Sequence, residues 1–316
     1  MARMDPHLTF GCEISLDVVA KHLEQLTDVQ HQFLRRLLGL HRRSILAVLF
    51  SETGVVPLAY RRPIIALGYL IYLITLPENH FATAAYLDSI LLARSGHPCW
   101  FSDLRFVLQK LPVPVQLSLG DLTADGVADI RKALEAACEK WIGETIADMS
   151  PRLPLIQGRL ECNAESALVP TAAKFRQYLR IPVPAHRKAL TRLVLSVHTL
   201  SVEILRYDER YRKRTPQEFR LCRFYRRAVE TEAHALITCS SLTLVALRHV
   251  FLLDVFRIVP EMPRRWESAE ELLRVMVQSK DFDLLQRLAK YIYEVLAEYT
   301  ACAMFRPAEY LYIRLE

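Results

Sequence analysis

The spacing of hydrophobic residues along this chain predicts helices over most of its length. Between positions 16 and 37 apolar residues recur at intervals of three, four and seven, which is the spacing of one helical face. Ser15 is in place to cap this helix, and Gly39 follows just past its end. The same reasoning predicts further helices at 44–50, 63–76, 81–94, 103–110, 126–148, 185–201, 228–256, 268–278 and 282–303.

Strand patterns are scarce by comparison. Only 113–119 and 310–313 have the composition of strands. The predicted fold class is therefore mainly α.

Short polar side chains mark several of the predicted helix starts. Ser102 would cap the helix at 103–110, and Thr123 or Asp125 would cap the helix at 126–148. Asp281 and Asp283 would do the same for the helix that begins at 282.

Prolines interrupt the helical pattern between 151 and 184, where five of them cut the chain into short pieces. A chain of 316 residues has room for about two domains. We therefore predict two helical domains, at 1–150 and 185–316, joined by a proline-rich hinge at 151–184.

Composition and motifs argue against an enzyme. The chain has 9 glycines in 316 residues, well below the usual ~7%, and it contains no glycine-rich phosphate loop. It also lacks the Gly-x-Ser-x-Gly elbow and the His-Glu-x-x-His zinc pair. We expect no catalytic residues, and no small-molecule site is evident.

The distribution of apolar residues and cysteines predicts an intracellular protein, nuclear or cytoplasmic. The longest apolar run, 64–76, is shorter than the ~20 residues that cross a membrane. The first 27 residues have no signal-peptide core. The 7 cysteines have no paired spacing over most of the chain, as expected in a reducing compartment.

The net charge of +6 is concentrated in one segment, 206–227, which we call the basic window. Aromatic residues, Tyr211 among them, alternate there with cations, so phosphates could be neutralised while bases stack. Arg187 and Lys188, upstream of the window, could add contacts. The cations of the window are Arg206, Arg210, Arg212, Lys213, Arg214, Arg220, Arg223, Arg226 and Arg227. The pattern predicts RNA or DNA as the partner.

A possible metal site overlaps the end of this window. Cys222, His234 and Cys239 have the spacing of a CCHC zinc knuckle in which Tyr225 stands at the second cysteine position. Tyrosine is a poor zinc ligand, because its phenol has a pKa of ~10. Two interpretations remain open: a bound zinc ion, or a metal-free remnant at 222–239 in which Tyr225 stacks on a neighbouring ring.

The same segment resembles the zinc-knuckle region of LINE-type (non-LTR) retrotransposon reverse transcriptases. In that family a Cys-x-x-Cys precedes Glu-x-Glu-x-His-x-Leu-x-x-Cys, which Glu230, Glu232, His234 and Cys239 match. Stretches within 32–62, 92–105 and 180–212 resemble the thumb, linker and post-polymerase regions of such elements in mushroom-forming fungi.

The resemblance implies a C-terminal fragment that holds RNA or DNA. The palm carboxylates of the polymerase and any endonuclease motif are missing, so neither activity carries over. The alternative function is a helical scaffold for other proteins, presenting apolar faces at 64–76 and 250–258. The sequence leaves open the preference for RNA or DNA and the oligomeric state.

Overall fold

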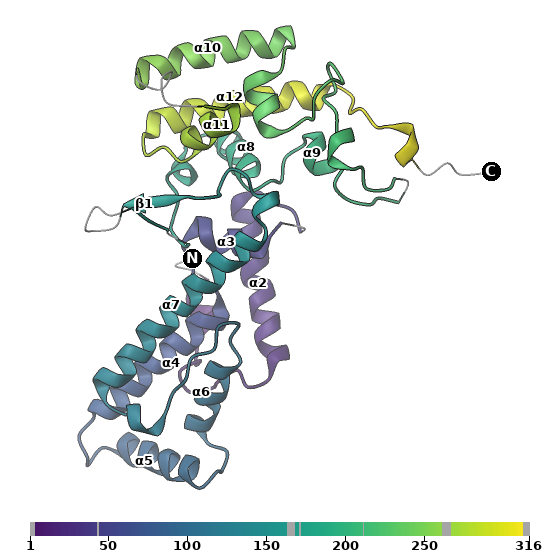
Figure 1. Cartoon of the computed structure of the whole chain (residues 1–316). Coiled ribbons are helices and arrows are strands. Elements are labelled where there is room, and N and C mark those ends of the chain that lie inside the picture. The colour runs from purple at the N-terminus through teal and green to yellow at the C-terminus, as the bar shows by residue number, and fades with distance from the viewer. Residues whose placement is uncertain are drawn as a thin grey trace, which may run out of the picture. The chain divides into compact units, whose positions relative to one another are not determined.

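The computed structural model describes residues 4–42, 44–162, 168–170, 172–210, 212–260 and 267–311. Most of the regular structure in this part of the chain is helical (Figure 1). The mainly α class is therefore confirmed. Among the described residues, no helix has both the length and the apolar character needed to cross a bilayer.

The chain divides into two compact units. The first comprises Met1–Arg36, Leu46–Asp148 and Thr171–Phe175, and the second comprises Leu37–Ile45, Met149–Pro170 and Arg176–Glu316. The proline-rich segment at 151–184 thus contributes to both units. A two-stranded antiparallel pair, β1 (Leu160–Cys162) and β2 (Leu168–Pro170), lies within this segment, where no strand was expected.

The first unit is built on α4 and α7, which lie side by side (Figure 1). Both helices bury an apolar face: Leu67 and Leu70 of α4 and Leu134 of α7 are fully buried. The rings of Tyr60 and Trp141 are 6.0 Å apart across this interface. The helices of the unit are α1 (Asp5–Thr9), α2 (Ala20–Leu38, whose last two residues belong to the second unit), α3 (Leu46–Thr53), α4 (Leu58–Thr75), α5 (Phe81–Arg94), α6 (Trp100–Gln109), η1 (Leu119–Asp121) and α7 (Ala124–Asp148).

Some predicted helix starts in this unit were wrong. The helix predicted from Pro63 begins at Leu58, and Pro63 lies inside it. Cys99, not Ser102, caps α6: its sulfur accepts from the Ser102 backbone N–H. Thr123 does cap α7, since its hydroxyl accepts from the Gly126 N–H at 3.1 Å. The strand expected at 113–119 is not formed among the described residues: the segment is irregular, and Leu119 begins η1.

One apolar face that was expected to be available to partners is instead part of the core. Within 64–76, the side chains of Ile64, Leu67 and Leu70 are buried in the first unit. This corrects the expectation for that segment.

The second unit packs α8, α10 and α11 around the C-terminal helix α12 (Figure 1). Leu193 of α8 and Ile292 of α12 are fully buried, and the rings of Phe251 and Tyr291 stack at 4.3 Å. Asp281 caps α12 by accepting from the Leu284 N–H at 2.9 Å. The elements are η2 (Ser150–Arg152), η3 (Gln177–Arg180), α8 (Pro184–Val194), α9 (Ser201–Ile204), η4 (Gln217–Phe219), η5 (His234–Thr238), α10 (Leu242–Ile258), α11 (Ala269–Val277), α12 (Phe282–Ala301) and η7 (Ala308–Tyr310).

Two long helices predicted in this unit are broken. The helix predicted at 185–201 ends at Val194, before Ser196 takes a left-handed φ of 50°. The tract predicted as helical from 228 to 256 contains a hairpin end, the five-residue π-helix η5 and only then α10. The second break contains His234 and precedes Cys239, both of the candidate site described below. Tyr310 ends a 3-10 helix, and the rest of the strand predicted at 310–313 lies largely outside the described residues.

Candidate metal centre and basic window

Cys222 lies at the start of a tight hairpin. Leu221 and Val229 form an antiparallel bridge, and the Cys222 N–H donates to the Ala228 carbonyl at 2.8 Å. The chain reverses between them because Arg226 adopts a left-handed φ of 55° and donates its N–H to the Cys222 carbonyl. The pKa of the Cys222 thiol is lowered first by Cys239 and, to a smaller extent, by the backbone N–H groups of Tyr225 and Phe224 in this turn.

His234 and Cys239 are joined by a π-helical turn. Residues five apart do not share a face of an α-helix, which turns every 3.6 residues. In η5 the Cys239 N–H donates to the His234 carbonyl at 2.8 Å, so the chain is wound more widely. This wider turn brings the imidazole and the thiol together, and the chain becomes extended at Cys239.

The three side chains form a cluster suited to a metal ion. The ligand atoms of Cys222, His234 and Cys239 all lie within 4.8 Å of one another. The two sulfurs are 3.8 Å apart. Tetrahedral zinc with Zn–S bonds of about 2.3 Å would set its sulfurs about 3.8 Å apart. The spacing of the thiols therefore fits zinc without rearrangement.

The orientation of the His234 ring also suits metal binding. Its Nδ1 lies 3.3 Å from the Thr238 hydroxyl. Its Nε2 is buried and has no hydrogen-bond partner among the described residues. A buried unpartnered nitrogen is costly, and metal-bound histidines are commonly held by a hydrogen bond on the other ring nitrogen. His234 thus has the arrangement of a ligand.

The contact between the two thiols shifts their pKa values in opposite directions. The hydrogen bond between the two sulfurs holds the pKa of the Cys222 thiol well below its ordinary value. The same contact raises the pKa of Cys239. One sulfur is thereby prepared as a thiolate, which is the form that binds metal.

Tyr225 does not occupy the fourth corner with its hydroxyl. The side chain is 44% exposed, and its hydroxyl donates to the Ser240 carbonyl at 2.8 Å. The neighbouring Phe224 packs edge-on against Tyr299, with ring centroids 5.0 Å apart.

Tyr299, from α12, is the site residue that the sequence analysis missed. It is fully buried, and its hydroxyl lies 3.9 Å from the Cys222 sulfur. Burial first, and its hydrogen bond with Cys239 second, raise the pKa of this phenol. The sequence did contain a signal that Tyr299 is buried: it lies four residues after Val295 and seven after Ile292, on the apolar face of α12. Both of those residues are buried.

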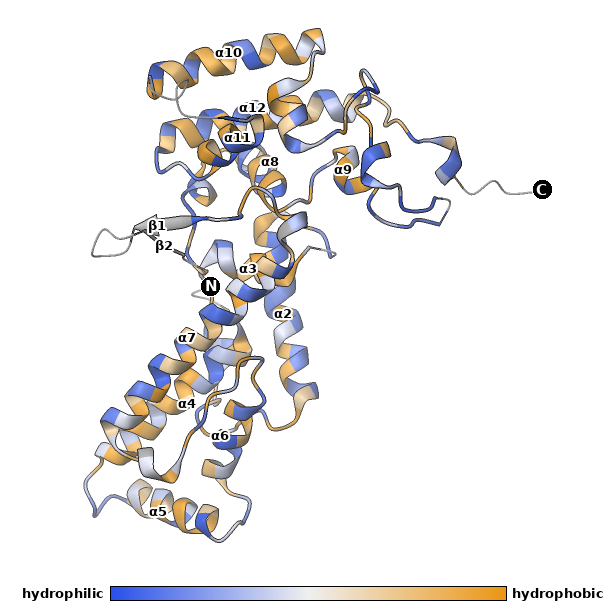
Figure 2. Ribbon diagram, in the orientation of Figure 1, coloured by the Kyte–Doolittle hydropathy of each residue, from blue (hydrophilic) through white to orange (hydrophobic). Residues whose placement is uncertain are grey.

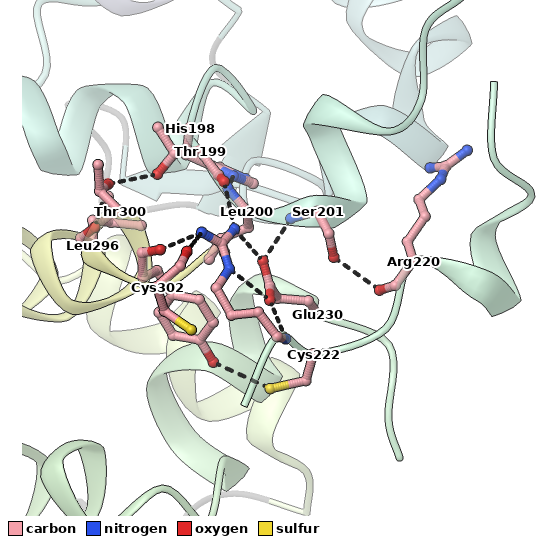
Figure 3. Close-up of polar contacts among 12 residues, drawn as sticks. His198, Thr199, Leu200, Ser201, Arg220, Cys222, Glu230, Leu296, Thr300 and Cys302 are labelled. Atoms are coloured by element: carbon pink, nitrogen blue, oxygen red, sulfur yellow. Dashed lines mark hydrogen bonds and ion pairs between the residues drawn. The ribbon is translucent and has the colours of Figure 1, made fainter. Parts of the chain in front are cut away.

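Three cations of the basic window are inside the protein. Arg223 forms a buried ion pair with Glu230, 2.7 Å from Nη2 to Oε1. Glu230 also accepts from the Ser201 backbone N–H at 2.7 Å (Figure 3). Arg212 donates to the carbonyls of Ile204 and Lys213.

Arg220 is the third, with its guanidinium bonded to the carbonyls of Thr215 and Val202. Burial lowers the pKa of this group. Arg212, Arg220 and Arg223 were predicted to contact phosphates, and this prediction is corrected: their guanidinium groups bind protein acceptors and do not face solvent.

The other cations of the window lie nearer the surface. Arg206 is partly buried and pairs with Glu203 at 3.0 Å. Arg226 lies over the Phe305 ring, 4.8 Å from its centroid. Tyr211 falls outside the described residues. The exposed cations are Arg210, Lys213, Arg214, Arg226 and Arg227.

Arg187 and Lys188 lie on α8, not in the window. Arg187 is partly buried and donates to the Ile181 carbonyl at 2.5 Å, whereas Lys188 is exposed. Of the two, Lys188 is the one whose charge faces solvent.

Both acidic residues of the Glu-x-Glu-x-His pattern have internal partners. Glu230 is bonded to Arg223, and Glu232 lies 2.8 Å from Nε2 of His198, a side chain that is fully buried. The Leu200 N–H donates to Nδ1 of the same ring at 3.4 Å. These carboxylates therefore hold the loop between α8 and α9 against the hairpin.

No protein-family model matches this chain, and neither the curated proteins nor the solved structures contain a significant match. The function is therefore inferred from its own residues.

Proposed function

We propose that this protein binds RNA or DNA through the exposed cations of its basic window and performs no catalysis. In this proposal it is related to the C-terminal region of LINE-type reverse transcriptases and acts inside the cell, in the nucleus or cytoplasm. The proposal rests on a difference in burial among the cations of the window. Buried Arg212, Arg220 and Arg223 anchor it, while five other cations face solvent.

Fixed loops suit this role because little conformational entropy is lost when they bind. Exposed aromatic rings accompany the cations: Phe219 is 41% exposed and Tyr225 is 44% exposed. Rings of this kind stack on unpaired bases, and guanidinium groups pair with phosphates. The proposed ligand is therefore a nucleic acid with accessible phosphates and bases.

Salt dependence tests the proposal. If five cations neutralise five phosphates of a duplex, the log–log slope of affinity against salt is about −4.5. Between about 50 mM and about 200 mM salt the affinity then falls about 500-fold. Fluorescence anisotropy with a duplex DNA and a single-stranded RNA measures this. Absence of binding to both at the lower salt would contradict the proposal.

A pair of variants locates the contact. Changing Lys213 and Arg214 together to alanine should make the slope shallower by about 2. The matched control is Arg131→Ala with Lys132→Ala on α7, two adjacent exposed cations outside the window. The control should keep the slope of the unmodified protein. Equal effects of the two double variants would refute the location.

We also propose that Cys222, His234 and Cys239 hold a structural zinc ion. Zinc would join the hairpin at 221–229 to η5 and so fix the C-terminal end of the window. Elemental analysis of the purified protein should give about one zinc per chain. Cys222→Ser should lose it, whereas Cys138→Ser, a buried thiol of the first unit, should retain it. A zinc content near zero in the unmodified protein refutes this part.

A protein-binding scaffold is the second candidate, and α10 favours it. Leu242 is 85% exposed, Val250 is 64% exposed and Leu253 is 46% exposed. Figure 2 shows the largely hydrophobic colouring of this helix. The predicted face at 250–258 is thus partly available. A scaffold of this kind would show partner binding that is insensitive to salt, which separates it from the first candidate.

A further inference from the structure

A tetrahedral metal at Cys222, His234 and Cys239 needs a fourth donor. The residue at the expected position, Tyr225, has its hydroxyl bonded to the Ser240 carbonyl at 2.8 Å. A site with only three protein ligands leaves a corner open to water, which structural zinc sites avoid. The fourth donor must therefore be sought elsewhere.

Tyr299 has the position that such a donor requires. Its hydroxyl lies 3.9 Å from the Cys222 sulfur, which in turn lies 3.8 Å from the Cys239 sulfur. Cys222, Cys239 and Tyr299 are all 0% exposed. The oxygen is thus on the inner side of the cluster, where solvent does not reach the sulfurs.

The ring is also held in place from two directions. Phe224 contacts it edge-on, with centroids 5.0 Å apart. The Arg223 guanidinium lies 5.2 Å from the ring centroid and donates to the Tyr299 carbonyl. Since Arg223 is itself paired with Glu230, the ring and the backbone of Tyr299 are both in contact with a buried ion pair.

We propose that Tyr299, and not Tyr225, supplies the fourth donor to the metal. The inference rests on the metal site proposed above. The phenol oxygen gives a lone pair to the cation and keeps its proton, whereas the remaining thiol proton passes to solvent. The chain would thereby close the site with an oxygen from α12, and the metal would join the hairpin, η5 and the C-terminal helix.

Cobalt(II) is the probe, because its visible absorption reports the donors around it. The full-length protein should give a tetrahedral spectrum that added azide does not change. Tyr299→Phe should bind Co²⁺ about 10–100-fold more weakly, with a shifted spectrum that azide changes further. The matched control, Tyr225→Phe, should behave as the unmodified protein does.

Three results would overturn the inference, and they are distinguishable. If Tyr299→Phe keeps both the spectrum and the affinity, the fourth donor is another group. If azide changes the spectrum of the unmodified protein, the corner is held by exchangeable water. If the unmodified protein binds no Co²⁺, the metal site itself is refuted. Nucleic-acid binding is measured separately by anisotropy, so its failure is not confused with any of these.

Discussion

Arg223 and Glu230 form an ion pair in which both side chains are buried, with 2.7 Å between Nη2 and Oε1. The carboxylate accepts further bonds from Nε and from the backbone N–H of the same arginine (Figure 3). The bonds between the two residues join the strands of the hairpin, and further bonds tie it to its surroundings: Arg223 donates to the Thr199 carbonyl and Glu230 accepts from the Ser201 N–H. An arginine from the most cationic segment of the chain therefore acts as a fold-stabilising residue.

Arg223→Ala should strongly destabilise the protein. Removing one partner leaves Glu230 as an uncompensated buried charge, which costs about 3–5 kcal/mol. Chemical denaturation followed by circular dichroism measures the loss in the free energy of unfolding. Arg227→Ala, an exposed arginine four residues away, should change it by less than about 0.5 kcal/mol. Similar losses in the two variants would contradict the structural role of Arg223.

Tyr225→Cys should strengthen metal binding. The variant restores a second cysteine at the knuckle turn, and its thiolate should displace the Tyr299 oxygen from the metal because a thiolate is a far better zinc ligand than a phenol. In competition with a chromophoric chelator the affinity for zinc should rise. The cobalt form should gain sulfur-to-metal charge-transfer absorption. Tyr225→Ser removes the same ring without adding sulfur, and it should not gain this absorption. A Tyr225→Cys variant with unchanged affinity would show that this position does not face the metal.

Asp281→Ala should destabilise α12 by about 1 kcal/mol, within a range of about 0.5–2. The Asp281 carboxylate accepts from the Leu284 N–H, which is otherwise unsatisfied at the helix start. Asp283 lies in the first turn of the same helix but is not its cap. Asp283→Ala should therefore cost less in the free energy of unfolding. If the two variants are equally unstable, the cap assignment is wrong.

Stability should fall on mild acidification because of His31. Burial lowers the pKa of this imidazole below its usual 6.5, and Arg35 lowers it further. The unfolded chain then binds the proton more readily than the folded one, so stability is complete above pH about 6.5 and declines below it. The ring packs edge-on against Phe50, with centroids 5.7 Å apart.

His31→Phe removes the titrating group and keeps an aromatic ring. The difference in unfolding free energy between this variant and the unmodified protein should change between pH about 7.5 and about 5.5, in favour of the variant at the lower pH. A difference independent of pH would exclude His31 as the cause.

The helical periodicity predicted some elements to the residue and failed at others for identifiable reasons. The helix at 81–94 coincides with α5 because its pattern is bounded by clear breaks and followed by Gly96. The tract at 228–256 was read as one helix because its composition is helical throughout. Contacts of Cys239 and Glu230 with other segments decide otherwise, and no local pattern reports them.

The sequence by itself determined the helical class, the position of the excess charge and the spacing of Cys222, His234 and Cys239, because each is a property of neighbouring residues. Only the tertiary structure decided which arginines of the window face inward, how a π-helical turn joins His234 to Cys239, and that Tyr299 lies beside the thiols. The physical reason is that burial and donor geometry arise where distant segments meet. Tyr299 is 77 residues from Cys222 along the chain, yet their side chains are in contact.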